Sequence, residues 1–213
     1  MKNFVQNDLN DVKIGIVFTG VDQQVEIMAS GFNARKAAQV VAYLANKSPN
    51  LRLNVLKAMK LVYLADRESL RQTGFPILDD DRFSMPHGPV NSMTLRLANG
   101  ELEDASWSEL IEDRSSHELS VTDAGQACDW DELSEAELQC LDKVWQEFGH
   151  MDRFALRDWT HDPKNIPEWE DPNGSAFPIP VRRILQNLAV ENPDAHSQLI
   201  EDHRRIDQLL ANL

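Results

Sequence analysis

The chain has 213 residues, of which 42% are hydrophobic and 26% charged, a composition that suits one water-soluble domain with short appendages. No run approaches the roughly 20 apolar residues of a membrane helix, and the first residues lack the layout of a signal peptide. Two cysteines, Cys128 and Cys140, are too few for a disulfide scaffold or a four-cysteine zinc site, so we expect structural roles for both. These features favour a cytoplasmic protein that contacts no membrane.

The formal net charge of −14 is concentrated in residues 99–142, which hold 14 acidic residues and one basic residue, Arg114. Such a chain is expected to bind nucleic acids poorly, because their affinity comes largely from neutralised phosphates. Residues 1–98 carry a net charge of +3, which leaves room for a local basic patch. Two interpretations of the acidic stretch stay open: a solvated surface that favours solubility, or a surface that attracts a basic partner.

Three parts of the chain are predicted from the hydrophobic pattern. Residues 1–30 are expected to be an N-terminal extension with one short strand, because apolar and other residues alternate over 12–18. Residues 31–192 are expected to form a helical domain. Residues 193–213 are expected to form a C-terminal helix.

The first two helices of the domain are predicted from their caps and periodicity. One begins after Asn33, a favourable N-cap residue, and runs to Ala45 with apolar residues at three- and four-residue spacing. The second is predicted from Leu53 to Gln72. It is apolar on nearly all sides, so we expect it to be central and buried.

The segment after the second helix is predicted to contain a turn, a short strand and a third helix. Asp79–Asp81 lacks the alternating oxygen ligands and the glycine of a calcium loop, which indicates a solvated turn. Residues 82–85 are predicted to form a short strand. Gly88-Pro89 is then expected to open a helix, with proline at its first position, and Asn99-Gly100 to end it.

The second half is predicted to be mostly helical. A short strand over 118–121 is expected to pair with the strand at 82–85. Ser134 and Glu137 form a capping box for a helix that Gly149 ends. Beyond it we expect a short helix to about His161, a proline-rich loop over 162–180, and helices over 181–190 and 194–210. The predicted fold class is mainly α, a compact helical domain with a small antiparallel β element.

No pattern in the sequence indicates catalysis. The chain has no Gly-x-Ser-x-Gly nucleophile elbow, no phosphate-binding glycine loop and no pair of histidines spaced for zinc on one helix. The dipeptide His161-Asp162 is of a kind that supplies metal ligands, and a metal-dependent hydrolase built on it is the weakest function considered, because two further ligands are missing. We expect no enzymatic activity, no cofactor and no metal.

Three clusters of polar and aromatic residues are candidates for a binding surface. The first places Asp66 and Arg67 on the buried helix, either as a structural salt bridge that seats the following loop or as part of a recognition surface. The second, residues 85–90, is interpreted in the same two ways, with His87 hydrogen-bonded to hold a strand-to-helix connection. The third, an expected aromatic plug under the long loop, consists of Trp159, His161 and Trp169.

Four pieces of the chain, in order, carry a family resemblance. Lys60–Glu68 is similar to a K-L-x-Y-x-A-D helix, Gly74–Ile77 to a G-x-P-I turn, and Met85–Val90 to an M-x-H-G-P-V segment. Thr160-His161 and Trp169 match a later T/S-H pair and tryptophan. Together they resemble the Panacea domain, also called the SocA-like domain, over roughly residues 33–190. The stretch between the last two matches is longer than usual in the family.

The resemblance implies a compact, mostly helical fold with a small β element and no enzymatic activity. Proteins with this domain are known as antitoxins that neutralise toxins encoded beside them. Some are associated with phages, and one is an adaptor that delivers its toxin to a protease. We therefore expect a cytoplasmic antitoxin that binds and masks a protein toxin. The alternative is a proteolytic adaptor or a phage-associated interaction module.

The expected partners follow from the same resemblance. They are a toxin encoded nearby and, for an adaptor, a protease or unfoldase; the sequence leaves the oligomeric state open. The residues expected to bind the partner are Tyr63, Asp66, Arg67, His87, Gly88, Pro89, Val90, His161 and Trp169.

Overall fold

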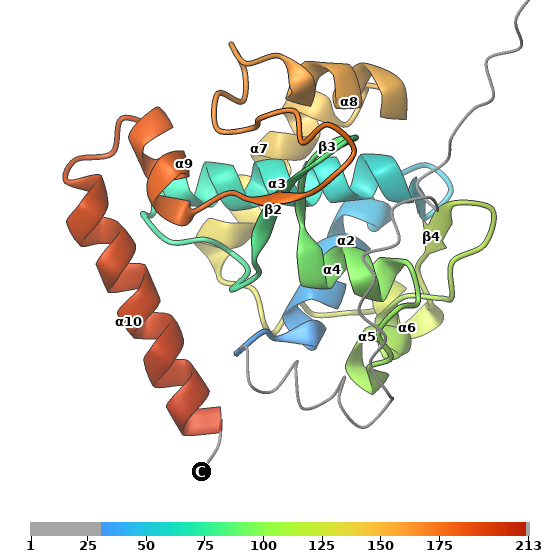
Figure 1. Cartoon of the computed structure of the whole chain (residues 1–213). Coiled ribbons are helices and arrows are strands. Elements are labelled where there is room, and N and C mark those ends of the chain that lie inside the picture. The colour runs from blue at the N-terminus through green and yellow to red at the C-terminus, as the bar shows by residue number, and fades with distance from the viewer. Residues whose placement is uncertain (1–30, 212–213) are drawn as a thin grey trace, which may run out of the picture.

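The computed structural model describes residues 31–211, and the predicted N-terminal strand lies outside them (Figure 1). Its helices are α2 (Ala34–Asn46), α3 (Val55–Gln72), α4 (Ser92–Ala98), α5 (Ala105–Leu110), α6 (Asp123–Gln126), α7 (Glu135–Phe148), α8 (Arg153–His161), α9 (Val181–Asn187) and α10 (Pro193–Ala211). Its strands are β1 (Arg52–Asn54), β2 (Arg82–Met85), β3 (Gly88–Asn91), β4 (Glu118–Ser120) and β5 (Phe177–Pro178). The predicted fold class, mainly α with a small antiparallel β element, is confirmed.

Helix α3 runs through the middle of the fold and contacts α2, α7, α8 and β3 (Figure 1). Thirteen of its 18 residues are buried, which confirms the prediction of a central helix. It begins at Val55 and not at Leu53, because residues 52–54 pair as a strand. The Asn54 side chain then caps the helix by accepting a hydrogen bond from the Leu56 N–H.

Local capping signals were reliable elsewhere in the chain. Asn33 caps α2 by accepting a hydrogen bond from the Lys36 N–H at 2.9 Å. Ser134 and Glu137 form the predicted capping box at the start of α7, and Gly149 caps its end. Helix α8 ends at His161 as predicted, whereas α9 ends three residues before the predicted Val190.

The strands form two small antiparallel sheets, in the orders β1-β4 and β3-β2-β5. The expected pairing of residues 118–121 with 82–85 is therefore wrong. Strand β4 pairs with β1, which places Leu119 opposite Leu53. Both sides of β2 are already occupied, because Ser84 lies opposite Pro89 of β3 and Phe177 of β5.

The expectation that Gly88-Pro89 opens a helix is also wrong. Residues 88–91 form strand β3, which returns along β2 after the turn at Pro86-His87. Proline is tolerated in β3 because this strand lies at the edge of its sheet. Helix α4 begins only at Ser92.

The start of α4 is held by Asp80, which corrects the expectation of a solvated turn at Asp79–Asp81. The Asp80 carboxylate is fully buried and accepts hydrogen bonds from the N–H groups of Met93 and Thr94 at 2.9 and 2.8 Å and from the Thr94 hydroxyl at 2.7 Å. It thus satisfies donors that the first turn of a helix leaves without partners.

Helix α10 lies beside α9 at the edge of the fold (Figure 1). His196 Nε2 lies 2.8 Å from the Gly74 carbonyl oxygen, and the Phe75 ring contacts both His196 and His203. These contacts attach α10 to the loop that follows α3. Over residues 31–211, no helix is long and apolar enough to cross a membrane.

We predict that Asp80→Ala lowers the free energy of unfolding by about 2–4 kcal/mol, because it leaves the buried Met93 and Thr94 N–H groups without acceptors. The matched control is Asp81→Ala. Its carboxylate is exposed and pairs with Arg204 at 2.8 Å, so this change should cost less than about 1 kcal/mol. Urea unfolding followed by circular dichroism measures both. Equal losses would mean that Asp80 does not hold α4.

Candidate functional site

Asp66 joins helix α3 to strands β2 and β3. Its buried carboxylate accepts hydrogen bonds from the Leu78 N–H at 2.9 Å, from Arg82 Nε at 3.0 Å and from Asn91 Nδ2 at 2.9 Å. Arg82 is buried as well and also donates to the carbonyl oxygens of Leu78 and Asp80. A buried ion pair contributes to stability only when its remaining donors and acceptors are satisfied, and here they largely are.

Arg67 pairs with Glu168, so Asp66 and Arg67, which are neighbours on α3, do not pair with each other. Arg67 Nε donates to Glu168 Oε1 at 2.6 Å, and the buried Tyr63 hydroxyl donates to the same oxygen at 2.9 Å. Glu168 is fully buried in the loop after α8. Burial and the Glu168 carboxylate raise the pKa of Tyr63 well above its ordinary value. This second network fixes the loop to α3.

The turn between β2 and β3 closes over Gly88, whose φ of +96° favours glycine. A Cβ atom at this position would lie 2.9 Å from Lys60 Nζ, 3.0 Å from Thr160 Oγ1 and 3.0 Å from His161 Cδ2. Lys60 is fully buried, and its Nζ donates to the Pro89 carbonyl oxygen at 2.8 Å. Side chains from α3 and α8 therefore meet at the Gly88 backbone.

His161 and Trp169 form the outer layer of the site. Their rings stack with centroids 4.4 Å apart and planes at 14°, and Trp169 Nε1 donates to the Met85 carbonyl oxygen at 3.2 Å. Burial, and then the charges of Lys60 and Arg157, lower the pKa of His161 to about 4. The predicted plug is thus formed by two of its three residues, since Trp159 packs edge-on against Phe148 instead.

The structure brings the nine predicted residues together from α3, β3, the β2–β3 turn, the end of α8 and the loop after it, but it exposes few of them. Arg67, His87, His161 and Trp169 are half-buried. The His87 ring makes no hydrogen bond to any residue from 31 to 211, contrary to the expectation that it holds the turn. The buried members of the set are Tyr63, Asp66, Gly88, Pro89 and Val90. Whether any of the nine touches a partner stays a prediction.

Three residues that complete the networks were missed by the sequence analysis. Arg82 was assigned only to a strand, Glu168 to a loop, and Lys60 to a family pattern without a role. A charged residue at a strand start or in a proline-rich loop is usually exposed, so neither Arg82 nor Glu168 carried a signal of burial. Lys60 did carry one, because it stands within the apolar run of α3.

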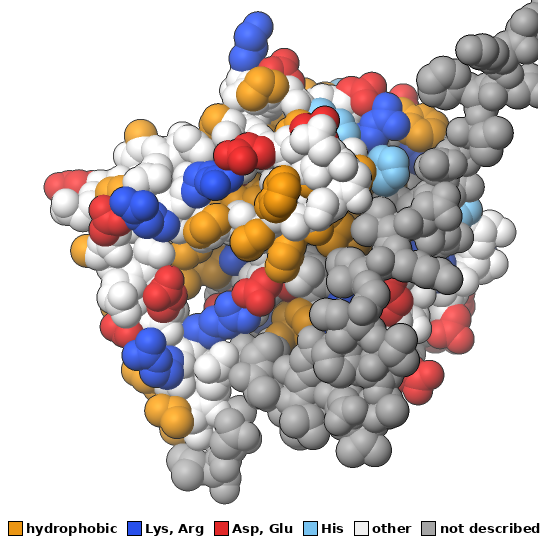
Figure 2. Space-filling view, viewed as in Figure 1, with side chains coloured by type: hydrophobic (Ala, Val, Ile, Leu, Met, Phe, Trp, Pro, Cys, Tyr) orange, Lys and Arg blue, Asp and Glu red, His pale blue; other side chains and the backbone are white. Residues whose placement is uncertain are grey.

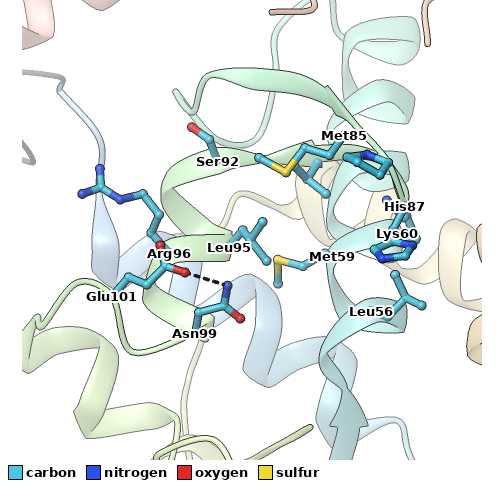
Figure 3. Close-up of a pocket in the computed structure, with 12 residues that line it drawn as sticks. Leu56, Met59, Lys60, Met85, His87, Ser92, Leu95, Arg96, Asn99 and Glu101 are labelled. Atoms are coloured by element: carbon cyan, nitrogen blue, oxygen red, sulfur yellow. Dashed lines mark hydrogen bonds between the residues drawn. The ribbon is translucent and has the colours of Figure 1, made fainter. Parts of the chain in front are cut away.

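A pocket of about 60 Å³ opens beside the turn, between α3 and α4 (Figure 3). Met59 and Leu95 point toward each other in its middle, and Lys60 and His87 lie together at one end. Burial, and then the charge of Lys60, lower the pKa of His87. Its lining is Leu56, Met59, Lys60, Met85, Pro86, His87, Val90, Ser92, Leu95, Arg96, Asn99 and Glu101.

Potential metal ligands gather elsewhere. Among the described residues, Cys128, Asp129 and Asp131 bring their ligand atoms within 4.8 Å of one another at the surface. Asp131 there accepts a hydrogen bond from Gln39 and lies 3.6 Å from Arg35. His161 and Asp162 belong to no such group among residues 31–211.

We predict that Gly88→Ala costs at least about 1 kcal/mol more in free energy of unfolding than Gly100→Ala. Both glycines have positive φ, at +96° and +70°, so both changes strain the backbone. Only at Gly88 would the new methyl group press on buried side chains, because no atom lies within 4 Å of a Cβ at Gly100. Chemical denaturation of the two variants measures the difference. Equal costs would show that the crowding is relieved easily.

We predict that acid destabilises the fold through His161. Between pH 6.5 and about 4 the unfolded chain binds a proton at this ring and the folded chain does not, so the free energy of unfolding decreases as the pH falls. The loss should be a fraction of the roughly 1.4 kcal/mol per pH unit that one proton allows, because water screens the half-buried ring.

The variant that tests this is His161→Phe, which retains a ring against Trp169 and cannot titrate. Urea unfolding at pH 7 and pH 5 should show a smaller acid-induced loss for this variant than for the unchanged chain. His150→Gln, at an exposed position, is the control and should change nothing. An undiminished loss in His161→Phe would assign the acid sensitivity to other groups.

Comparison with known proteins identifies the region that contains the site. The model of the family described as antitoxin SocA-like, Panacea domain, matches residues 58–170, more than half of the chain. The match begins in α3 and ends just after Glu168 and Trp169, so it spans both networks and the turn. No curated protein and no solved structure matches. The chain therefore belongs to the SocA-like antitoxin family, and it carries the Panacea domain of that family.

Proposed function

We propose that this chain is a cytoplasmic antitoxin that neutralises a protein toxin by binding to it directly. The observation that carries the proposal is the family match, which covers the whole polar core of the site. The contacts are assigned to its half-buried members, Arg67, His87, His161 and Trp169. The buried members of the predicted set position them.

The rigidity of the site supports a role in recognition. Asp66 fixes the strands on either side of the turn, and Glu168 fixes the loop that carries Trp169. Side chains that are already ordered lose little conformational entropy on binding, so a partner that contacts them binds more tightly. A surface held by buried ion pairs suits a partner of fixed shape.

The surface beside the site has the composition of an interface. Figure 2 shows hydrophobic side chains gathered in the middle of the face on which the loop before α9 runs, with acidic and basic side chains around them. Phe177 of β5 is 47% exposed and is paired to the same sheet as the turn. Masking a toxin takes an interface of roughly 1,200–2,000 Å², with aromatic and arginine anchors near its centre.

The acidic stretch favours a basic partner. None of the 14 acidic side chains in residues 99–142 is buried, and ten of them are exposed. Such a field speeds the encounter with a basic protein, and salt screens it. In this proposal the stretch contributes to the association rate, while the turn and the loop contribute the close contacts.

The proposal predicts that this chain restores the growth of cells arrested by the product of the adjacent open reading frame. His87→Ala should weaken the rescue about tenfold or more in the amount of antitoxin required, because it removes a half-exposed ring whose loss leaves no buried group unpaired. His150→Ala, at an exposed position outside the site, should rescue fully. Melting curves should show both variants folded.

One further readout separates masking from degradation. Toxin half-life should be unchanged by this chain if it masks the toxin, and shortened if it delivers the toxin to a protease. A harmless neighbouring product, or arrest that this chain does not relieve, would contradict the proposal. If His87→Ala is folded and rescues as well as His150→Ala, the turn is not the contact surface.

A further inference from the structure

The amine of Lys60 is buried in an unusual setting for a lysine. It lies inside α3 with 0% of its side chain exposed, and Nζ has one hydrogen-bond acceptor, the Pro89 carbonyl oxygen at 2.8 Å. An ammonium group carries three N–H donors, so the charged form would leave two of them buried without acceptors. The neutral amine has two N–H donors and leaves only one of them without an acceptor.

The charges around Nζ also favour the neutral amine. Among residues 31–211, no carboxylate forms an ion pair with Lys60, and the neighbouring charged side chain is Arg157 of α8. Burial and the Arg157 guanidinium together lower the pKa of Lys60 well below its ordinary value. Burial is the first cause of the lowered pKa values of His87 and His161, which face the same amine. A buried lysine with a lowered pKa holds more of its amine in the neutral form, which carries the lone pair that makes it a nucleophile.

The pocket provides the space for a reactant. Lys60 lines one end of it, and Leu56, Met59, Met85 and Leu95 make the walls largely apolar (Figure 3). At roughly 10–15 Å³ for each water-sized occupant, 60 Å³ holds about four to six heavy atoms. The turn that covers the amine is formed by half-buried Pro86 and His87.

His161 supplies a group that can move a proton. Its Nε2 is buried and has no hydrogen-bond partner among the described residues. His161 Cδ2, bonded to Nε2, and Lys60 Nζ both lie within 3.0 Å of the same point beside Gly88.

We propose that Lys60 is a reactive amine that condenses with a small apolar aldehyde bound in this pocket. Nζ attacks the carbonyl carbon, the C=O π electrons move to oxygen, and the proton lost from nitrogen passes to that oxygen through His161 Nε2. Loss of water from this carbinolamine then leaves an imine between Nζ and the former carbonyl carbon. This chemistry is independent of toxin binding and stands or falls separately from the antitoxin proposal.

The test uses the full chain with isobutyraldehyde, which has five heavy atoms, and sodium cyanoborohydride, which reduces the imine to a stable amine. Peptide mass spectrometry then gives a labelling rate for each lysine. At pH 7, Lys60 should be labelled at least tenfold faster than exposed Lys164. Between pH 7 and pH 9 the labelling rate at Lys60 should rise less steeply with pH than the rate at Lys164.

A variant separates entry of the aldehyde through the pocket from entry by unfolding of the chain. Leu95→Phe fills the pocket without touching the amine and should slow labelling of Lys60 about tenfold or more, with Lys164 unchanged. The proposal is overturned if Lys60 stays unlabelled while exposed lysines react, or if its rate rises with pH in step with Lys164. A folded Leu95→Phe variant that is labelled at the original rate also overturns it. The pH comparison needs no variant, so it decides the matter even if Leu95→Phe does not fold.

Discussion

The structure depends on one buried carboxylate, that of Asp66. It receives hydrogen bonds from the backbone after α3, from β2 through Arg82 and from β3 through Asn91, so three segments take their positions from a single side chain. The Asp66 carboxylate joins the helix to both strands, and Lys60 Nζ adds one more hydrogen bond from α3 to the hairpin, at the Pro89 carbonyl oxygen. With the hairpin fixed, the Gly88 backbone lies against the side chains of Lys60, Thr160 and His161. These contacts restrict the position of the turn.

Sequence patterns predicted the elements whose signals are local. The cap at Asn33 and the box at Ser134 are contained within four residues, and both were found where predicted. The errors arose where a distant group decides the outcome. Pro89 belongs to a strand because β2 lies beside it, and Asp80 is buried because α4 begins twelve residues later and needs acceptors. The residues next to Pro89 and Asp80 in the sequence indicate neither outcome.

The candidate site was predicted as a set of residues but not as a set of interactions. Family resemblance placed Arg67, His87, His161 and Trp169 in one site, and the structure brings them together. The resemblance could not show that Arg67 binds Glu168, which is 101 positions away, or that Asp66 binds Arg82. Packing also decides which members are buried. Of the nine residues predicted to contact a partner, four are half-buried and five are buried.

The span of the Glu168 network bears on the synthesis of the protein. Tyr63 and Arg67 leave the ribosome long before the carboxylate that joins them, since 105 and 101 positions separate the partners. Until Glu168 is synthesised, Tyr63 and Arg67 lack this partner, and the loop that carries Trp169 has not yet been made. Closing so large a loop is slow compared with forming a helix, so this network forms late. A chain that terminates before Glu168 would lack this network, however much helix it contained.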